Sequence, residues 1–358
     1  MQNKTRELFT AYLHQLQQLN GVADATHKFT VAPTIQQKLE KKIQESSAFL
    51  SSINVMPVTE QEGEKLGLGV GGPIASTTDT SKQDRMTADP STLDSQKYRA
   101  EQTNFDTHIT YAKLDAWAKF PNFQTLIRDA IVQRCALDRI MIGFNGRKRA
   151  ATSDRTANPL LQDVNTGWLQ HYRDEASERV LDHGKVAGKV MIGAGDADYA
   201  NLDALVFDAV SNLLEPWYQE DTQLVVICGR KLLHDKYFPI VNATQPPTER
   251  IAADLIMSQK RIGNLPAVRV PAFPANALMV TRLDNLSMYY QEGARRRTVI
   301  DNAKRDRIEN YESSNDGYVV EDFGAGCLVE NIVFVEPPPE KTNEQKTAGK
   351  PADEQKAG

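Results

Sequence analysis

The feature of the sequence that most constrains its fold is a polar segment of about fifty residues, 59–110, between two more apolar regions. It is rich in Gly, Ser, Thr and Asp, and only residues 65–70 and 104–111 alternate like β-strands. Such a segment cannot form its own core, and one this long is usually functional or disordered. Two arms of ~20 residues at ~3.3 Å each reach ~60 Å, far beyond a domain radius of ~20 Å. We therefore expect a long hairpin that lies on another surface, such as a second subunit.

The regions on either side of this segment predict regular structure. Apolar residues recur at helical spacing before Asn20-Gly21 and again over residues 122–145, which predicts one long helix of ~36 Å. Residues 200–300 read as a compact α/β unit. The other expected elements are a helix at 34–51 with Thr34 as N-cap, a strand at 55–58, a helix at 202–214 with Asn201 as N-cap, and strands at 224–228 and 277–281.

Composition excludes several classes of protein. The 358 residues carry a net charge of −5, which argues against a basic DNA-coating protein. No apolar run approaches the ~18 residues of a membrane span, and the N-terminus lacks the apolar core of a signal peptide, so we expect a cytosolic chain. The three cysteines, far apart and in apolar runs, predict buried small side chains. Residues 336–358 are of low complexity and predict a disordered tail.

One glycine-rich motif, residues 67–72, fits the pattern G-x-G-x-x-G. A dinucleotide site needs the last glycine to open a helix, whereas Pro73 and a Ser/Thr-rich loop follow here. The residues of this motif are better read as a hairpin tip: Gly69, Gly71, Gly72 and Pro73. No other motif predicts catalytic, cofactor-binding or metal-binding residues, so we expect no enzyme.

Two basic clusters stand out, Arg147-Lys148-Arg149 and Arg295-Arg296-Arg297. Each could meet phosphate or an acidic patch on a neighbouring subunit. A solvated surface explains three adjacent charges equally well, and both interpretations stay open.

Several stretches, in order along residues 1–335, resemble the phage P2 family of major capsid proteins of tailed bacteriophages, which have the HK97-type fold. The stretches that carry the resemblance are QESS at 44–47, GPIASTTDT at 72–80, GFNG at 143–146, TSDR at 152–155, NPLLQDV at 158–164, LLEPWYQED at 213–221, SQKRIGNLPAVRVP at 258–271, ENYES at 309–313 and YVVED at 318–322.

The resemblance implies an α+β fold with an N-terminal arm, an extended β-hairpin loop, a spine helix in a peripheral domain and an α/β axial domain. The parts it implies are an N-terminal segment removed on maturation (1–29), the arm (30–55), the extended loop (56–110), the peripheral domain with the spine helix (111–200), the axial domain (201–295) and the return to the peripheral domain (296–335). The tail at 336–358 lies outside the resemblance.

The same resemblance implies a major capsid protein, found in the virion capsid and, during assembly, in the host cytoplasm. It implies pentamers and hexamers that form an icosahedral procapsid and then a mature head around double-stranded DNA. The implied partners are other copies of the chain, an internal scaffold protein with protease activity, the portal protein, and decoration or completion proteins, with no membrane. Cleavage between Phe29 and Thr30 is the matching hypothesis for maturation.

Two other classes remain as alternatives. A nucleotide-binding enzyme would have to use the glycine-rich motif. Another virion protein, such as a scaffold or decoration protein, is the second, but a scaffold should be mainly helical and polar. The predicted buried strands at 224–228 and 277–281 contradict that composition.

Overall fold

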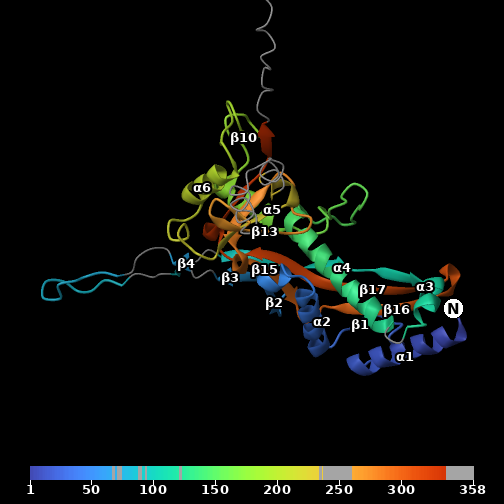
Figure 1. Cartoon of the computed structure of the whole chain (residues 1–358). Coiled ribbons are helices and arrows are strands. Elements are labelled where there is room, and N and C mark those ends of the chain that lie inside the picture. The colour runs from blue at the N-terminus through green and yellow to red at the C-terminus, as the bar shows by residue number, and fades with distance from the viewer. Residues whose placement is uncertain are drawn as a thin grey trace, which may run out of the picture.

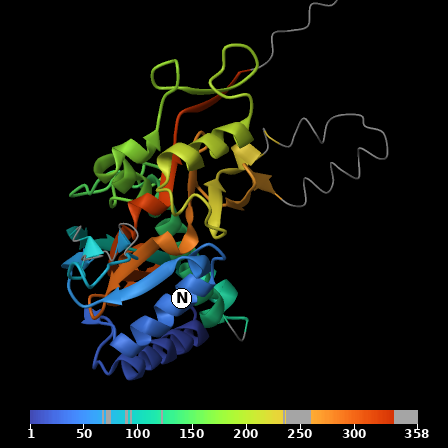
Figure 2. The same cartoon turned by 90° about the vertical axis from the view of Figure 1, so that its left-hand side faces the viewer.

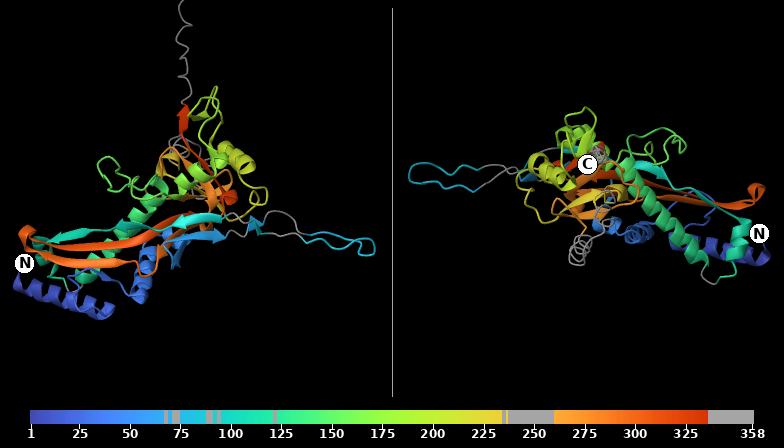
Figure 3. Two further views of the ribbon diagram at one scale, coloured as in Figure 1. Left: turned by 180° about the vertical axis from the view of Figure 1, so that it is seen from behind. Right: turned by 45° about the horizontal axis from the view of Figure 1, so that its top comes forward.

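The computed structural model combines a long base, a compact upper lobe and a projecting hairpin (Figure 1). The hairpin leaves the end of the base opposite the N-terminus (Figure 3). No helix among the described residues is long and apolar enough to cross a membrane. The structure describes residues 1–66, 69–70, 75–87, 91–92, 95–120, 123–233, 236 and 260–335.

Two helices form the N-terminal part of the base, on the side of the sheet away from the upper lobe (Figure 2). Helix α1, Asn3–Asn20, ends at Gly21, whose positive φ of 64° closes the helix as a C-terminal cap. Helix α2 spans Pro33–Glu45, so the prediction of Thr34 as N-cap is wrong. Proline fits the first helical turn because its fixed φ suits the helix and its missing N–H needs no partner there.

A seven-stranded sheet forms the base, and its central strand is β17, Arg307–Val320. Strands β15, Leu286–Gln291, and β16, Arg296–Asn302, pair one after the other along one edge of β17. Its other edge pairs with β7, Glu101–Asn104, and β8, Thr107–Thr110. The outer strands are β2, Asn54–Val58, parallel to β15, and β1, Phe29–Thr30, antiparallel to β16.

The predicted long helix is confirmed as α4, Phe123–Asn145, which packs against α2 and α5, Trp168–Glu175. Gly143 lets α5 approach closely, since a Cβ there would lie 2.2 Å from the Trp168 ring. The Trp168 and Phe144 rings meet edge to face at 5.0 Å. The Trp168 indole Nε1–H donates to the carbonyl of Ser287 at 2.9 Å, which fixes the helices to the sheet. A short helix, α3, Tyr111–Trp117, joins β8 to α4.

The upper lobe contains a six-stranded sheet and helix α6, Leu202–Leu213. The Asn201 side chain caps α6 by accepting from the Ala204 N–H, as predicted. The sheet order is β12 (Arg261–Ile262), β13 (Leu265–Arg269), β11 (Leu224–Cys228), β14 (Leu278–Arg282), β18 (Gly326–Val329) and β9 (Val180–Leu181). Strands β10, Val190–Gly193, and β19, Ile332–Val335, form a separate parallel pair.

The strand pairing corrects the expected compact unit at 200–300. Strands β15 and β16 from that range belong to the base, while β18 and β9 from outside it complete the upper sheet. Sequence patterns could not show this, because β15 and β14 are both short, nearly fully buried strands. The two sheets therefore cross the boundary predicted at 295.

The predicted hairpin is present. Strand β3, Glu62–Leu66, pairs with β6, Ser95–Arg99, and β4, Gly69–Val70, pairs with β5, Ser91–Thr92. Lys65 and Tyr98 anchor its base, because Lys65 Nζ donates to the Val320 carbonyl at 2.8 Å and Tyr98 packs edge to face on Tyr289. Residues 75–87 continue outward and are almost all exposed.

Candidate processing and assembly sites

The predicted cleavage bond lies within β1, at the edge of the base sheet. Phe29 pairs with Arg297 and Thr30 with Arg296, and the Val31 N–H donates to the Arg295 carbonyl at 2.9 Å. Phe29 is only 8% exposed, whereas Thr30 faces solvent. The bond that the sequence singled out is therefore part of the folded sheet.

Helix α1 lies over an apolar surface that β1 helps to form. Its residues Phe9 and Leu16 are buried in a small core that also contains Phe29 and parts of α3, β16 and β17. Arg297 donates to the Tyr12 hydroxyl at 2.8 Å, and Arg6 pairs with Asp301 at 3.3 Å. A mainly apolar cavity of about 100 Å³ remains beneath the helix. The segment 1–29 is thus docked on the base through its own separate core.

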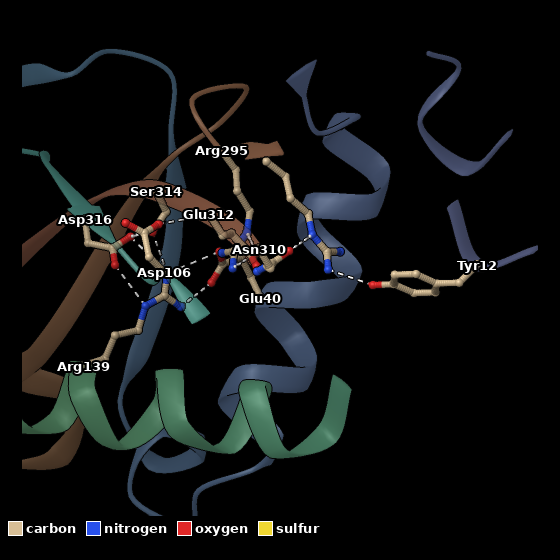
Figure 4. Close-up of polar contacts among 10 residues, drawn as sticks. Tyr12, Glu40, Asp106, Arg139, Arg295, Asn310, Glu312, Ser314 and Asp316 are labelled. Carbon is tan, nitrogen blue, oxygen red and sulfur yellow. Dashed lines mark hydrogen bonds and ion pairs between the residues drawn. The ribbon is translucent and has the colours of Figure 1, made fainter. Parts of the chain in front are cut away.

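Arg139, Arg295, Glu40, Glu312 and Asp316 form a buried ionic network behind this region (Figure 4). The Glu40 carboxylate on α2 accepts from Arg139 of α4 at 2.5 Å and from Arg295 at 2.6 Å. Arg139 also pairs with Asp316 at 3.0 Å, and Arg295 with Glu312 at 2.5 Å, both on β17. The network therefore ties α2, α4 and the β15–β16 junction to the central strand.

The arginines set the ionisation of these carboxyl groups. Burial raises the pKa of Glu40, but attraction by Arg139 and Arg295 outweighs it and holds that pKa below its usual value. Arg295 and Arg297 outweigh the effect of burial on Glu312 in the same way, so its pKa is also lowered. Both groups stay charged at neutral pH inside the protein.

The structure separates the two predicted basic clusters by environment. Arg147, Lys148 and Arg149 follow α4 and are exposed, with Arg149 donating to the Val164 carbonyl at 2.9 Å. The reading of Arg295 as a surface charge is wrong: it is 1% exposed, because carboxylates from two other elements surround it.

The other two members of the second cluster differ from Arg295. Arg296 is exposed, beside Thr30 on β1. Arg297 is half-buried and donates to Asn310 as well as to Tyr12. Only Arg296 is therefore a fully accessible surface charge in this cluster.

The glycine-rich motif lies only partly within the described residues. Gly69 is in β4, opposite Thr92, so it belongs to the paired stem of the hairpin and not to its tip. Gly71, Gly72 and Pro73 lie outside the described residues. A backbone hydrogen bond from Lys82 N–H to the Asp79 carbonyl, 3.0 Å, marks a turn farther along the chain. No group of three or more metal-ligating side chains gathers within the described part of the chain.

The cysteines are buried, as predicted. Burial raises the pKa of the Cys135 and Cys327 thiols to about 12 and that of Cys228 to about 11. These thiols are therefore almost wholly protonated at neutral pH.

Sequence reasoning missed the ionic network entirely. One signal was present: Arg139 lies between the buried residues Ala136 and Ile140 on the apolar face of α4. A charge in such a stripe needs a buried partner. Nothing in the sequence showed that Glu40 and Asp316, 99 and 177 residues away, would supply it.

Comparison with known proteins identifies the class. Residues 8–332 match the family described as "Phage major capsid protein, P2 family". The chain is 56% identical over 340 residues to the capsid protein of Escherichia phage P2, covering 93% of this chain and 95% of that one. It is 43% identical to the major capsid protein of Serratia phage KSP20, over 94% of this chain and 99% of the relative. A solved chain of the satellite phage P4 procapsid, which includes the size determination protein Sid, matches with TM-score 0.78 and 53% identity over 94% of this chain and 99% of that chain.

These matches define a structural protein of phage heads. The chain belongs to the P2 family of phage major capsid proteins. Its fold is the α+β HK97-type capsid fold that the resemblance implied, and its function is that of a major capsid protein, which assembles into multimeric shells.

Proposed function

We propose that copies of this chain close into rings of five and six, and that these rings build an icosahedral procapsid and then a mature head around double-stranded DNA. The strong similarity to a procapsid subunit of satellite phage P4 supports this assembly. Contacts between different surfaces of identical subunits close into rings when their rotation allows it.

The projecting hairpin is the observation that carries the proposal. Residues 75–87 are almost all exposed and extend far from the molecule's own cores, so they contribute little to folding (Figure 1). An arm of this kind gains stabilising contacts only from a neighbour. The hairpin therefore lies on the adjacent subunit of the shell, and the exposed cations Arg147, Lys148, Arg149 and Arg296 are candidates for contacts with acidic neighbours.

The two sheets supply the two domains of the subunit. The base sheet with α4 acts as the peripheral domain, and the upper lobe acts as the axial domain around the five-fold and six-fold centres. In this division the base includes both β15 and β16, residues 286–302. The domain boundary expected at residue 295 had put these two strands in different domains. The N-terminal arm begins at Thr30, the second residue of β1.

Maturation removes residues 1–29 by cleavage between Phe29 and Thr30. A separate core for α1 supports the loss of this segment, because its removal leaves the two larger cores intact. A scaffold protein with protease activity performs the cleavage inside the shell. The portal protein and decoration or completion proteins are further partners, and a size-determining protein like Sid of satellite phage P4 is another. Assembly takes place in the host cytoplasm.

Co-expression with the scaffold–protease of the same genome tests this proposal. We expect closed shells by negative-stain electron microscopy and, by intact mass spectrometry, a subunit that begins at Thr30. Shells whose subunits keep Met1 would refute the cleavage and retain the assembly. A chain that stays monomeric beside an active scaffold–protease would contradict the assembly itself.

A further inference from the structure

The bond between Phe29 and Thr30 is in a place that a protease cannot use directly. The Phe29 ring is packed in the small core with Phe9, Leu16 and Val299, and Val31, two residues on, is 3% exposed. Lys28 and Thr30 face solvent, so the side chains alternate between core and water along the strand. Every second side chain near the bond is therefore out of reach.

Proteases bind their substrates as extended chains and place the side chain before the cleaved bond in a pocket of their own. Strand β1 is at the sheet edge, so one side of its backbone is open. The Phe29 ring, however, cannot enter a protease pocket while it fills the core beneath α1. A position at the edge of the sheet is therefore not enough to make the Phe29–Thr30 bond cleavable.

We propose that the Phe29–Thr30 bond is latent in the folded chain and becomes cleavable only when α1 and β1 separate together from β16. This inference rests on the processing proposed above and adds the step that controls it. Docking of α1 keeps the strand closed, because Phe9 and Leu16 cover the same core that holds Phe29. The Tyr12–Arg297 hydrogen bond joins α1 to the residue that pairs with Phe29.

Such an opening is local. The two larger cores contain no buried residue before Ile43, and Leu39 is the first residue packed against them, so separation of residues 1–31 leaves them intact. A cavity of about 100 Å³ lies against Phe9 and Tyr12 of α1, so part of the inner face of this helix has no packing partner. Segments with few buried contacts open at lower free energy than the rest of a protein.

Hydrolysis makes the opening irreversible. The C–N bond between Phe29 and Thr30 breaks, and water adds its hydroxyl to the Phe29 carbonyl carbon and its remaining proton to the Thr30 nitrogen. The new carboxyl group then gives its proton to the amine, which leaves a carboxylate and an ammonium group. The covalent tether that kept α1 at high local concentration is then gone, so the segment dissociates. Any partner that separates α1 from the base thereby makes the Phe29–Thr30 bond accessible to a protease.

Remote variants that loosen α1 provide the first test. The purified unassembled chain is treated with chymotrypsin, which cleaves after phenylalanine, and the fragment that ends at Phe29 is measured by mass spectrometry. Phe9→Ala removes a buried ring 20 positions before Phe29, and cleavage at this bond should become at least roughly tenfold faster because it follows the open population. Leu19→Ala on the same helix, 52% exposed, is the matched control and should leave the rate unchanged. Equal rates for all three chains would overturn the proposal.

A reversible lock provides the second test. The Val31–Arg295 hydrogen bond makes Thr30 and Arg296 a non-hydrogen-bonded pair, with Cα atoms about 4.5 Å apart, a separation that allows a disulfide. In the variant Thr30→Cys/Arg296→Cys, oxidation should slow chymotrypsin cleavage after Phe29 at least roughly tenfold relative to the reduced form of the same variant. Cleavage at the same rate in both forms would show that strand separation is not required.

The two proposals fail separately. Chymotrypsin reports access to the bond whether or not the phage protease uses it. Mature shells whose subunits begin at a residue other than Thr30 would refute the proposed processing site and leave the measured latency unchanged. Fast cleavage of the unaltered chain by chymotrypsin, with shells that begin at Thr30, would refute the latency alone.

Discussion

Glu40 shows how one buried side chain can connect several parts of the subunit. Its carboxylate is shared between Arg139 and Arg295, and each arginine has a further partner on β17. Three residues before it on the chain, the Gln37 amide donates to Glu292, and Gln36 exchanges hydrogen bonds with Gln291 and Gly293. One face of α2 is therefore fixed to the junction between β15 and β16 by polar contacts.

Replacement of Glu40 by glutamine should destabilise the unassembled chain by about 1–3 kcal/mol, because Arg139 and Arg295 keep Asp316 and Glu312 but lose the charged acceptor that they share. Urea unfolding measures this loss, and Glu45→Gln, on the exposed side of the same helix, should change it little. The lowered pKa of Glu40 adds a pH dependence. The stabilisation by the Glu40 carboxylate is present above the unfolded pKa of about 4.5 and is lost as the pH falls below it. The difference in free energy of unfolding between the unaltered chain and Glu40→Gln should therefore become smaller in acid. A difference in free energy of unfolding that stays constant down to pH 3 would contradict a stabilising role of the charged Glu40 carboxylate.

At the scale of elements, α5 lies unusually close to α4. Gly143 and Gly167 permit this approach, since a Cβ at Gly167 would lie 2.4 Å from the Gly143 carbonyl oxygen. The same contact carries the Trp168 ring into the main core. The packing of α5 against α4 thus depends on two glycines, Gly143 and Gly167, which have no Cβ atom.

Gly143→Ala should therefore be strongly destabilising. Its methyl group would overlap the buried Trp168 ring, and relief would require a shift of α5, so we expect a loss of about 3 kcal/mol or more. Urea unfolding followed by tryptophan fluorescence measures the effect. Ala130→Ser, on the exposed side of the same helix, serves as control and should stay within about 0.5 kcal/mol. An unchanged midpoint for Gly143→Ala would show that the two helices can separate at no cost.

The helices were the part of the fold most accessible from sequence. Apolar residues recur at the helical period along the 23 residues of α4. Gly21 marks the C-terminal end of α1, and Asn201 marks the N-terminal end of α6, because each has the chemistry of a helix cap. The sheets were less accessible, because which strand pairs with β15 depends on tertiary contacts and not on its own residues. The burial of Arg295 was missed for the same reason, since its partner Glu40 is 255 residues away and Glu312, on β17, meets it only through strand pairing.

For the whole molecule, we expect the hairpin to be needed for assembly into shells but not for folding of the subunit. Leu66 and Ser95 are directly opposed, so replacing residues 67–94 by Asn-Gly gives a two-residue turn on an existing ladder. This shortened chain should keep its circular dichroism and thermal midpoint, yet form no shells when co-expressed with scaffold. The replacement removes the short β4–β5 pair and everything beyond it, and it keeps the β3–β6 pair. Normal shells from this variant would contradict the proposed contact with a neighbour.

The pairing of β2 with β15 also determines when the subunit can fold during its synthesis. Asn54 and its partner Ser287 are 233 residues apart, so at about 5–20 residues per second the first strand waits roughly ten to fifty seconds for the ribosome to make the second. The residues of helices α1 and α2 are synthesised early but have no sheet to lie on until β16 and β17 emerge. The nascent chain therefore carries its N-terminal apolar faces uncovered for most of translation, a period in which a chaperone or another binding protein can reach surfaces that the finished subunit hides.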